Sequence, residues 1–204
     1  MELRQYTLVP GKRELLVALF EREFLESQEN HGCRVIGQFR DLDNPDRFVW
    51  LRGFPDMELR KAALGTFYDG PVWKQHRDVA NDTMTDSDNV LLLRPATSQH
   101  GFHLAPERPR TLGEEPRMIA AVIYYAPAGE TPEIQSNAEL ARFVTEPSAN
   151  TFPRLPVREG ESVFIWFGAY QNAAAFEKER SSLTQVPRRT EVLRLEPTPR
   201  SLLR

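Results

Sequence analysis

The chain carries the same short pattern twice, about half its length apart. Residues 50–56 and residues 166–172 each read as the end of a tryptophan-containing strand, then an aromatic residue, then a helix N-cap, Asp56 or Asn172. The strands before and after this pattern also correspond, 2–8 with 118–125 and 90–95 with 192–197. A duplicated α/β unit predicts a fused pseudo-dimer, in which a ligand site can exist in one copy alone.

The first half follows a β-α-β-β-α-β pattern. Alternating and apolar runs predict strands at residues 2–8, 34–40, 47–54 and 87–94. The first helix is indicated by an apolar stripe at helical spacing, formed by Leu15, Leu16, Leu19, Phe20 and Phe24, and ends near residues 30–32. Asp56 caps the second helix, along one face of which Leu59, Ala63 and Phe67 follow at spacings of four residues.

The second half is expected to repeat this order less regularly. Its predicted strands are residues 117–126, 155–158, 162–170 and 191–196, and its predicted helices are residues 137–145 and 172–181. Pro153 and Pro156 suggest an edge position for its second strand. We place the boundaries at 1–95 for the first unit, 96–116 for a Pro- and Gly-containing linker, and 117–204 for the second unit.

The two copies differ by an insertion. Asp56 aligns with Asn172, 116 positions later, whereas Val90 aligns with Val192, 102 positions later. The difference of 14 residues is an insertion in the first copy or a deletion in the second, and it includes a predicted short helix at residues 72–83. This asymmetry is the first place to look for function.

The composition of the chain argues against several classes of partner and of protein. Charged residues make up 27% of the 204 residues and the net charge is −3, so neither a nucleic-acid nor a membrane partner is expected. No apolar run approaches the roughly 20 residues that span a bilayer. Cys33 is the one cysteine, which excludes an internal disulfide and favours a cytoplasmic setting, and we expect it to be a buried apolar filler.

His76, in the inserted helix, is the candidate catalytic residue. At helical spacing it shares a face with Val72, Val79 and Ala80, so it should point inward, where an imidazole serves proton transfer near neutral pH. The alternative is a hydrogen-bonded core histidine. Trp73 lies three residues away and either lines the same space or simply packs there.

Polar strand residues form the candidate ligand-binding set. Strand alternation places Arg4 with Tyr6, Trp50 with Arg52, and Gln38 with Ile36 and Arg40. An arginine inside a strand is costly to bury unless it is paired or faces a wet cavity. These side chains therefore line either a polar pocket for an anionic or carbonyl ligand, or the seam between the halves, tied there to carboxylates.

Standard chemistry motifs are absent. The sequence has no Gly-rich phosphate or dinucleotide loop, no paired cysteines and no nucleophile elbow, and we expect no cofactor. Asp41, Asp43 and Asp46 lack the glycine and distal glutamate of a calcium loop. His100 and His103 lie in the linker rather than on a helix, so no metal site is expected.

Several segments together resemble the NIPSNAP family: residues 2–12, 37–39, 50–54, 71–73 and 88–95. The resemblance covers the first half nearly end to end, and the second half looks like a diverged copy. It implies an α+β fold of two tandem ferredoxin-like units packed sheet to sheet as a dimeric α/β barrel within one chain. That superfamily includes cofactor-independent monooxygenases, haem-binding enzymes and isomerases, but the family supplies no catalytic residues to carry over.

Two functions stay open at this point. The first is binding, and conversion if the protein is an enzyme, of a small polar or aromatic metabolite in the first half. The second is a non-enzymatic scaffold or interaction module, which a pocket below about 300 Å³ would favour. In either case the chain should complete its barrel alone and be a monomer or homodimer.

Overall fold

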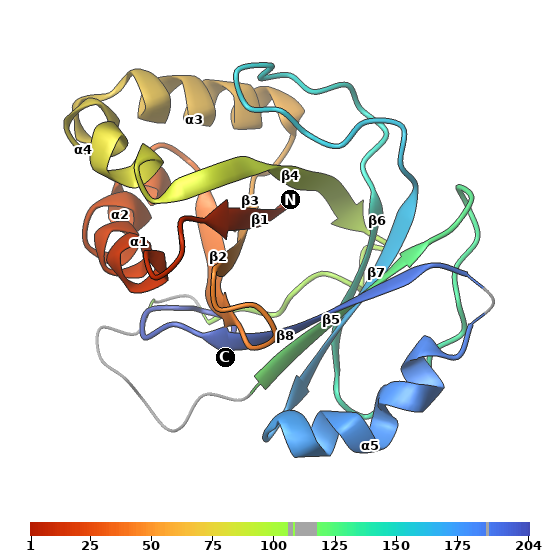
Figure 1. Cartoon of the computed structure of the whole chain (residues 1–204). Coiled ribbons are helices and arrows are strands. Elements are labelled where there is room, and N and C mark those ends of the chain that lie inside the picture. Colours follow the sequence, from red (N-terminus) through yellow and green to blue (C-terminus); the bar gives the residue numbers. More distant parts are fainter. Residues whose placement is uncertain (106–107, 109–117, 187) are drawn as a thin grey trace.

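Eight antiparallel strands form a closed barrel in the computed structural model of the chain (Figure 1), which describes residues 1–105, 108, 118–186 and 188–204. Their order around the barrel is β1-β3-β2-β8-β5-β7-β6-β4. The first-half strands follow the order β4-β1-β3-β2 and the second-half strands the equivalent order β8-β5-β7-β6. The repeated plan seen in the sequence is therefore a repeated strand order.

The first half contains four strands and the helices that cover their outer face. The elements are β1 (Glu2–Leu8), α1 (Arg13–Leu19), η1 (Phe20–Phe24), α2 (Leu25–Glu29), β2 (Arg34–Asp41), β3 (Arg47–Gly53), α3 (Met57–Asp69), α4 (Pro71–Asn81) and β4 (Met84–Pro95). Asp56 caps α3 as predicted, accepting a hydrogen bond from the backbone N–H of Leu59 at 2.7 Å. The side chain of Leu59 is half exposed, whereas Ala63 and Phe67 are buried.

The second half departs from the predicted element order. It contains β5 (Met118–Tyr125), β6 (Glu139–Thr145), β7 (Val163–Tyr170), α5 (Ala173–Thr184) and β8 (Thr190–Pro197). The helix predicted at residues 137–145 is wrong, because that segment is strand β6, paired with β7 on one side and β4 on the other. Residues 155–158 form no strand. Of the two helices per half that the fold prediction required, the described second half has one, α5.

The two sheets pack against each other through the barrel interior. The inner core takes residues from both halves, including Leu3, Val49 and Leu51 with Ile123, Ile165 and Phe167. Only three residue pairs join β2 to β8, and three join β4 to β6. Predicted linker residues 106–107 and 109–116 lie outside the described residues; Phe102 and Leu104, within the described part, pack against the inner core.

A β-bulge changes one predicted face. The register of β2 against β3 shifts between Val35 and Gly37. Ile36 therefore points into the barrel, whereas Gln38 lies opposite Trp50 on the helix-covered face. The prediction that Ile36 and Gln38 share a face was wrong for this reason.

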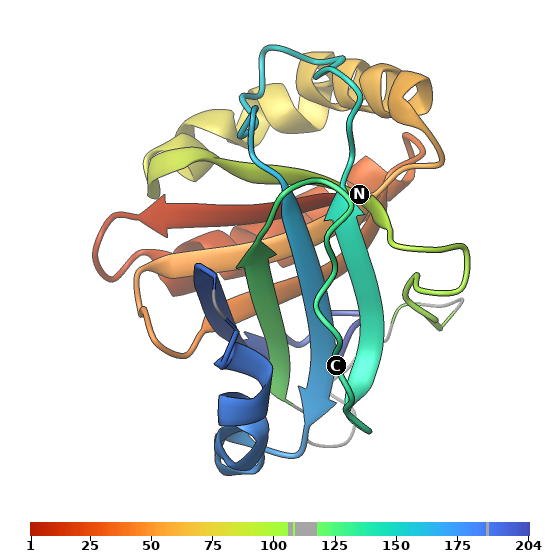
Figure 2. The same ribbon diagram turned by 90° about the vertical axis from the view of Figure 1, so that its right-hand side faces the viewer.

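A long connection between β6 and β7, residues 146–162, crosses from the second half onto the first. We call this segment the strap. In Figures 1 and 2 it runs beside α3, and its contacts there include Arg154 to Asp69 at 2.7 Å and Phe152 stacked on Tyr68. The equivalent connection in the first half, residues 42–46, is only a tight hairpin.

Candidate active site

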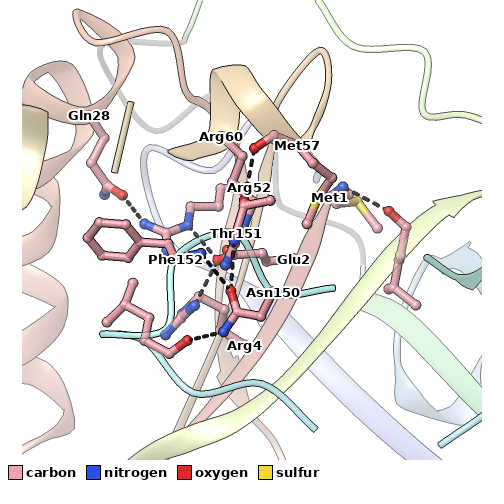
Figure 3. Close-up of polar contacts among 12 residues, drawn as sticks. Met1, Glu2, Arg4, Gln28, Arg52, Met57, Arg60, Asn150, Thr151 and Phe152 are labelled. Carbon is pink, nitrogen blue, oxygen red and sulfur yellow. Dashed lines mark hydrogen bonds and ion pairs between the residues drawn. The ribbon is translucent and has the colours of Figure 1, made fainter. Parts of the chain in front are cut away.

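One buried carboxylate, that of Glu2, receives three arginines on the helix-covered face of the first sheet (Figure 3). Its Oε2 lies 2.7 Å from Arg4 Nη1 and 2.6 Å from Arg52 Nε, and its Oε1 lies 2.6 Å from Arg60 Nε. All four side chains are at most 2% exposed. Strand alternation places Glu2 and Arg4 on one face of β1, neighbouring β3 supplies Arg52, and α3 supplies Arg60 above them.

The remaining partners of these guanidiniums are uncharged. Arg4 Nε donates to the Tyr6 hydroxyl at 2.9 Å and Arg52 Nη1 donates to Gln28 Oε1 at 2.9 Å. Arg60 Nη1 donates to Asn150 Oδ1 in the strap at 3.0 Å. Burial alone would raise the pKa of Glu2, but Arg52, Arg4 and Arg60 outweigh it and hold that pKa well below its usual range. The cluster therefore contains three positive charges and one negative charge.

An aromatic cavity lies beside this cluster, between the sheet and the helices. Seven of its eleven lining residues are aromatic: Tyr6, Phe20, Phe24, Trp50, Phe67, Tyr68 and Trp73. Its volume is about 30 Å³, enough for one or two water molecules. Tyr6, Trp50 and Gln28 belong to both the cavity wall and the surroundings of the arginines.

Trp50 is the central residue of this shared wall. The guanidinium carbons of Arg4 and Arg52 lie 5.5 and 4.9 Å from its ring centroid. Its Nε1 is buried and has no hydrogen-bond partner among the described residues. The equivalent Trp166 in the second half donates from Nε1 to Glu139 Oε2 at 3.1 Å. The two copies thus share the tryptophan but differ in whether its donor is satisfied.

The sequence model of the NIPSNAP family matches residues 1–99, the half of the chain that contains both the cavity and the arginine cluster. Residues 1–99 are a NIPSNAP domain. No curated protein matches the chain.

Three solved structures share the fold over nearly the whole chain. A provisionally assigned monooxygenase of Lactobacillus acidophilus NCFM is 14% identical, with a TM-score of 0.54 and coverage of 98% of this chain and 95% of its own. One of Fusobacterium nucleatum is 8% identical, with a TM-score of 0.55 and coverage of 96% and 90%. An anthrone oxidase-like protein is 12% identical, with a TM-score of 0.53 and coverage of 97% and 90%. At these identities the likeness shows the fold alone.

The structure brings most of the predicted ligand-binding residues together in the NIPSNAP domain. Tyr6, Trp50 and Trp73 line the cavity, and Arg4 and Arg52 lie directly behind its wall. Gln38 is fully buried on the same face of the sheet, with both amide atoms unpartnered among the described residues, but it does not line the cavity. The seam alternative misplaced the arginines: they pair with a carboxylate, but on the face opposite the barrel interior.

His76 lies at the outer side of the cavity. Its side chain is 20% exposed, its Nε2 is 3.5 Å from Glu23 Oε2, and its ring packs on Phe24, which lines the cavity. Val79 is 47% exposed and Ala80 is the buried residue of α4, so the predicted inward face holds only in part. Cys33 is buried as expected, and burial raises its pKa to about 12, which leaves it an unreactive thiol.

Other features of the described residues offer less chemistry. Two wider clefts, of about 340 and 480 Å³, adjoin each other at the strap and share Thr145, Pro147, Gly160 and Glu161. Within the described ranges there is no group of three or more potential metal ligands. None of the described helices has the length and apolarity to cross a membrane.

Proposed function

We propose that the NIPSNAP domain binds a small aromatic metabolite in the cavity between its sheet and its helices. The observation that carries this proposal is the asymmetry at the paired tryptophans. Trp166 donates to Glu139, whereas Trp50 leaves a buried N–H unpartnered among the described residues, in a cavity wall built mostly of aromatic side chains. A buried donor without an acceptor is costly, and a ligand oxygen would remove that cost.

In this proposal Trp73 occupies part of the ligand site when no ligand is bound. Its ring lies 4.8 to 5.9 Å from those of Tyr68, Phe24 and Phe67. Trp73 is only half-buried and belongs to α4, the inserted helix, in which Ala80 is the buried residue. If α4 moves outward, Trp73 leaves a ring-sized space beside Phe24, Phe67 and Tyr68, and in this proposal the 30 Å³ cavity is the closed state.

If the ligand is converted, the reaction we propose is cofactor-independent oxygenation or isomerisation. The names of the solved structures of like fold, provisionally assigned monooxygenases and an anthrone oxidase-like protein, support the oxygenation alternative. His76, beside Glu23, is the proposed general acid/base, and Tyr6, held by Arg4, would donate to a developing oxyanion. Arg52 acts through Trp50 and Gln28 rather than by contact.

The remaining organisation is part of the same proposal. Residues 1–95 and 117–204 would be two ferredoxin-like units joined by a linker at 96–116. The chain would act in the cytoplasm as a monomer or homodimer.

Replacing His76 tests the proposed site. We expect His76→Ala to abolish the thermal shift that an aromatic ligand produces while leaving the melting temperature of the free protein nearly unchanged, because His76 is partly exposed. A screen of small aromatic compounds by thermal shift, with mass spectrometry of molecules that co-purify, supplies the ligand. A large stability loss with unchanged ligand binding would instead assign His76 to the structural core.

A scaffold function is the second candidate, and one observation favours it. The cavity volume of about 30 Å³ is far below the roughly 300 Å³ at which small-molecule sites begin. The same screen separates the two functions. If neither the unmodified protein nor a Trp73→Ala variant binds an aromatic compound, and no molecule co-purifies, the scaffold is favoured.

A further inference from the structure

We infer that the NIPSNAP domain binds its aromatic ligand as an oxyanion, a phenolate or an enolate, whose oxygen lies at the Tyr6 and Trp50 wall of the cavity. The inference deepens the proposed function and rests on it. What it adds is the charge of the ligand and the residues that select for it.

The first argument is the charge balance of the cluster. Arg4, Arg52 and Arg60 pair with Glu2, and no other described residue gives them a carboxylate partner. Their further acceptors, the Tyr6 hydroxyl, Gln28, Asn150 and Thr151, are all neutral. Two positive charges are therefore left over at a site closed to solvent, which is costly unless an anion balances them.

The second argument is the set of unused donors. Arg52 Nη2 and Arg60 Nη2 are buried and have no acceptor among the described residues, as is true of Trp50 Nε1. Buried polar atoms in folded proteins are nearly always hydrogen-bonded. Trp50 lines the cavity, so a ligand that accepts hydrogen bonds can satisfy its Nε1, whereas the unused arginine donors lie behind the cavity wall and add to the positive charge there.

The third argument connects the cluster to the cavity. The Tyr6 hydroxyl accepts from Arg4 Nε, so its own hydrogen is available to a ligand in the cavity that Tyr6 lines. Burial raises the pKa of Tyr6, so it stays a neutral phenol and a donor. A phenol polarised by a guanidinium donates more strongly to an anionic oxygen than to a neutral one. Tyr6 would touch the ligand, and the arginines are positioning residues behind it.

These features predict discrimination between an acidic aromatic compound and its neutral ether. The ring of either compound gains the same packing in the cavity, but only the acidic compound can lose its hydroxyl proton to solvent and bring a negative charge to the cluster. The pKa of a bound phenol should therefore fall below its value in water.

A matched pair of probes tests this in the full chain. The acidic probe is 4-nitrophenol, whose visible absorbance reports its ionisation, and the neutral probe is 4-nitroanisole. We expect the protein to bind the phenolate at least about tenfold more tightly than the anisole, and the bound phenol to titrate at lower pH than the free phenol. Equal affinity for the two probes, or an unshifted titration, would overturn the inference while leaving aromatic binding intact. Failure of both probes to bind would overturn the proposed function itself.

Two variants reduce the surplus positive charge of the cluster in different ways, and neither changes a residue that lines the cavity. Arg60→Met removes a positive charge, and Asn150→Asp adds a negative one beside Arg60. Each should lower the phenolate-to-anisole affinity ratio about tenfold and reverse part of the titration shift. Gln171→Glu, an exposed change of the same type in the second half, is the control and should leave the ratio unchanged. A purely structural cluster would alter stability in both variants and move the ratio in neither.

Discussion

Glu2 is the residue on which the electrostatics of the cluster depend. Replacing it by Gln leaves three buried guanidiniums without a counter-charge, so we expect the free energy of unfolding to fall by about 3–5 kcal/mol, measured by urea denaturation. Glu14→Gln is the matched control, because Glu14 pairs with Arg40 but is 62% exposed. It should cost at most about 1 kcal/mol. Similar losses for both variants would contradict the view that burial makes the contribution of Glu2 to the free energy of unfolding large.

The same residue predicts a pH dependence. The arginines lower the pKa of Glu2 in the folded state, so its contribution is fully present above the ordinary carboxyl pKa of about 4.3 and is lost as the pH falls below it. Between pH 7 and pH 3 the unmodified protein should lose more stability than Glu2→Gln does. If the free energy of unfolding changed with pH in the same way for the two proteins, the pKa of Glu2 would not be lowered in the folded state.

At the level of single residues the sequence predicted part of the candidate site. Alternation along β1 and β3 placed Arg4 with Tyr6 and Trp50 with Arg52, and the structure has all four on the helix-covered face of the first sheet. The same alternation places Glu2 on the face of Arg4, a usable signal that was missed. Arg60 and Asn150 lie 58 and 148 positions after Glu2 in the chain. Their contacts with the cluster could not be predicted, because no local sequence pattern indicates contacts over such separations.

Among the secondary-structure elements, two glycines give opposite predictions. A Cβ at Gly168 in β7 would lie 2.2 Å from the ring of fully buried Trp166, so Gly168→Ala should destabilise the protein by roughly 1–3 kcal/mol. At Gly65 in α3 a Cβ meets nothing within 4 Å, and Gly65→Ala should stabilise by about 0.5–1 kcal/mol. Thermal unfolding of the two variants checks the signs. A stable Gly168→Ala protein would mean that Trp166 can move.

The errors at this scale have a physical cause. Residues 137–145 include helix-forming Ala138, Glu139, Leu140 and Ala141, but β4 and β7 both need a partner there to close the barrel. Pairing on two sides outweighs local propensity. The N-caps Asp56 and Asn172 were predicted correctly because a cap is decided within four residues.

For the whole molecule, the closed barrel predicts the behaviour of an isolated half. Residues 1–95 expressed alone would expose Leu3, Val49 and Leu51 of the inner core, so the fragment should dimerise or aggregate through its sheet. Sedimentation of the purified fragment provides the measurement. A soluble, cooperatively folded monomer would show that the halves do not depend on burying each other's sheets.

The sequence predicted this architecture well because duplication is visible without knowing any contact. Matching one half to the other predicted the extra chain that contains α4, and the resemblance to the NIPSNAP family predicted the barrel. The contacts between the strap and α3 could not be predicted from the sequence. They are made by Thr151, Phe152 and Arg154, which have no counterpart in the first half.

The strap has an evolutionary consequence. In an assembly of identical subunits, every subunit has the same β2–β3 connection. If that connection were long enough to pack on a neighbouring subunit, both subunits would carry the long form. Fusion of two copies removes that constraint, because each copy is encoded separately. The first copy has a five-residue hairpin and the buried arginines, whereas the second has a seventeen-residue connection at the same place and no helix among the described residues between its first two strands. Division of labour between the copies, one carrying the site and the other enclosing it, is open to a fused chain and closed to a homodimer.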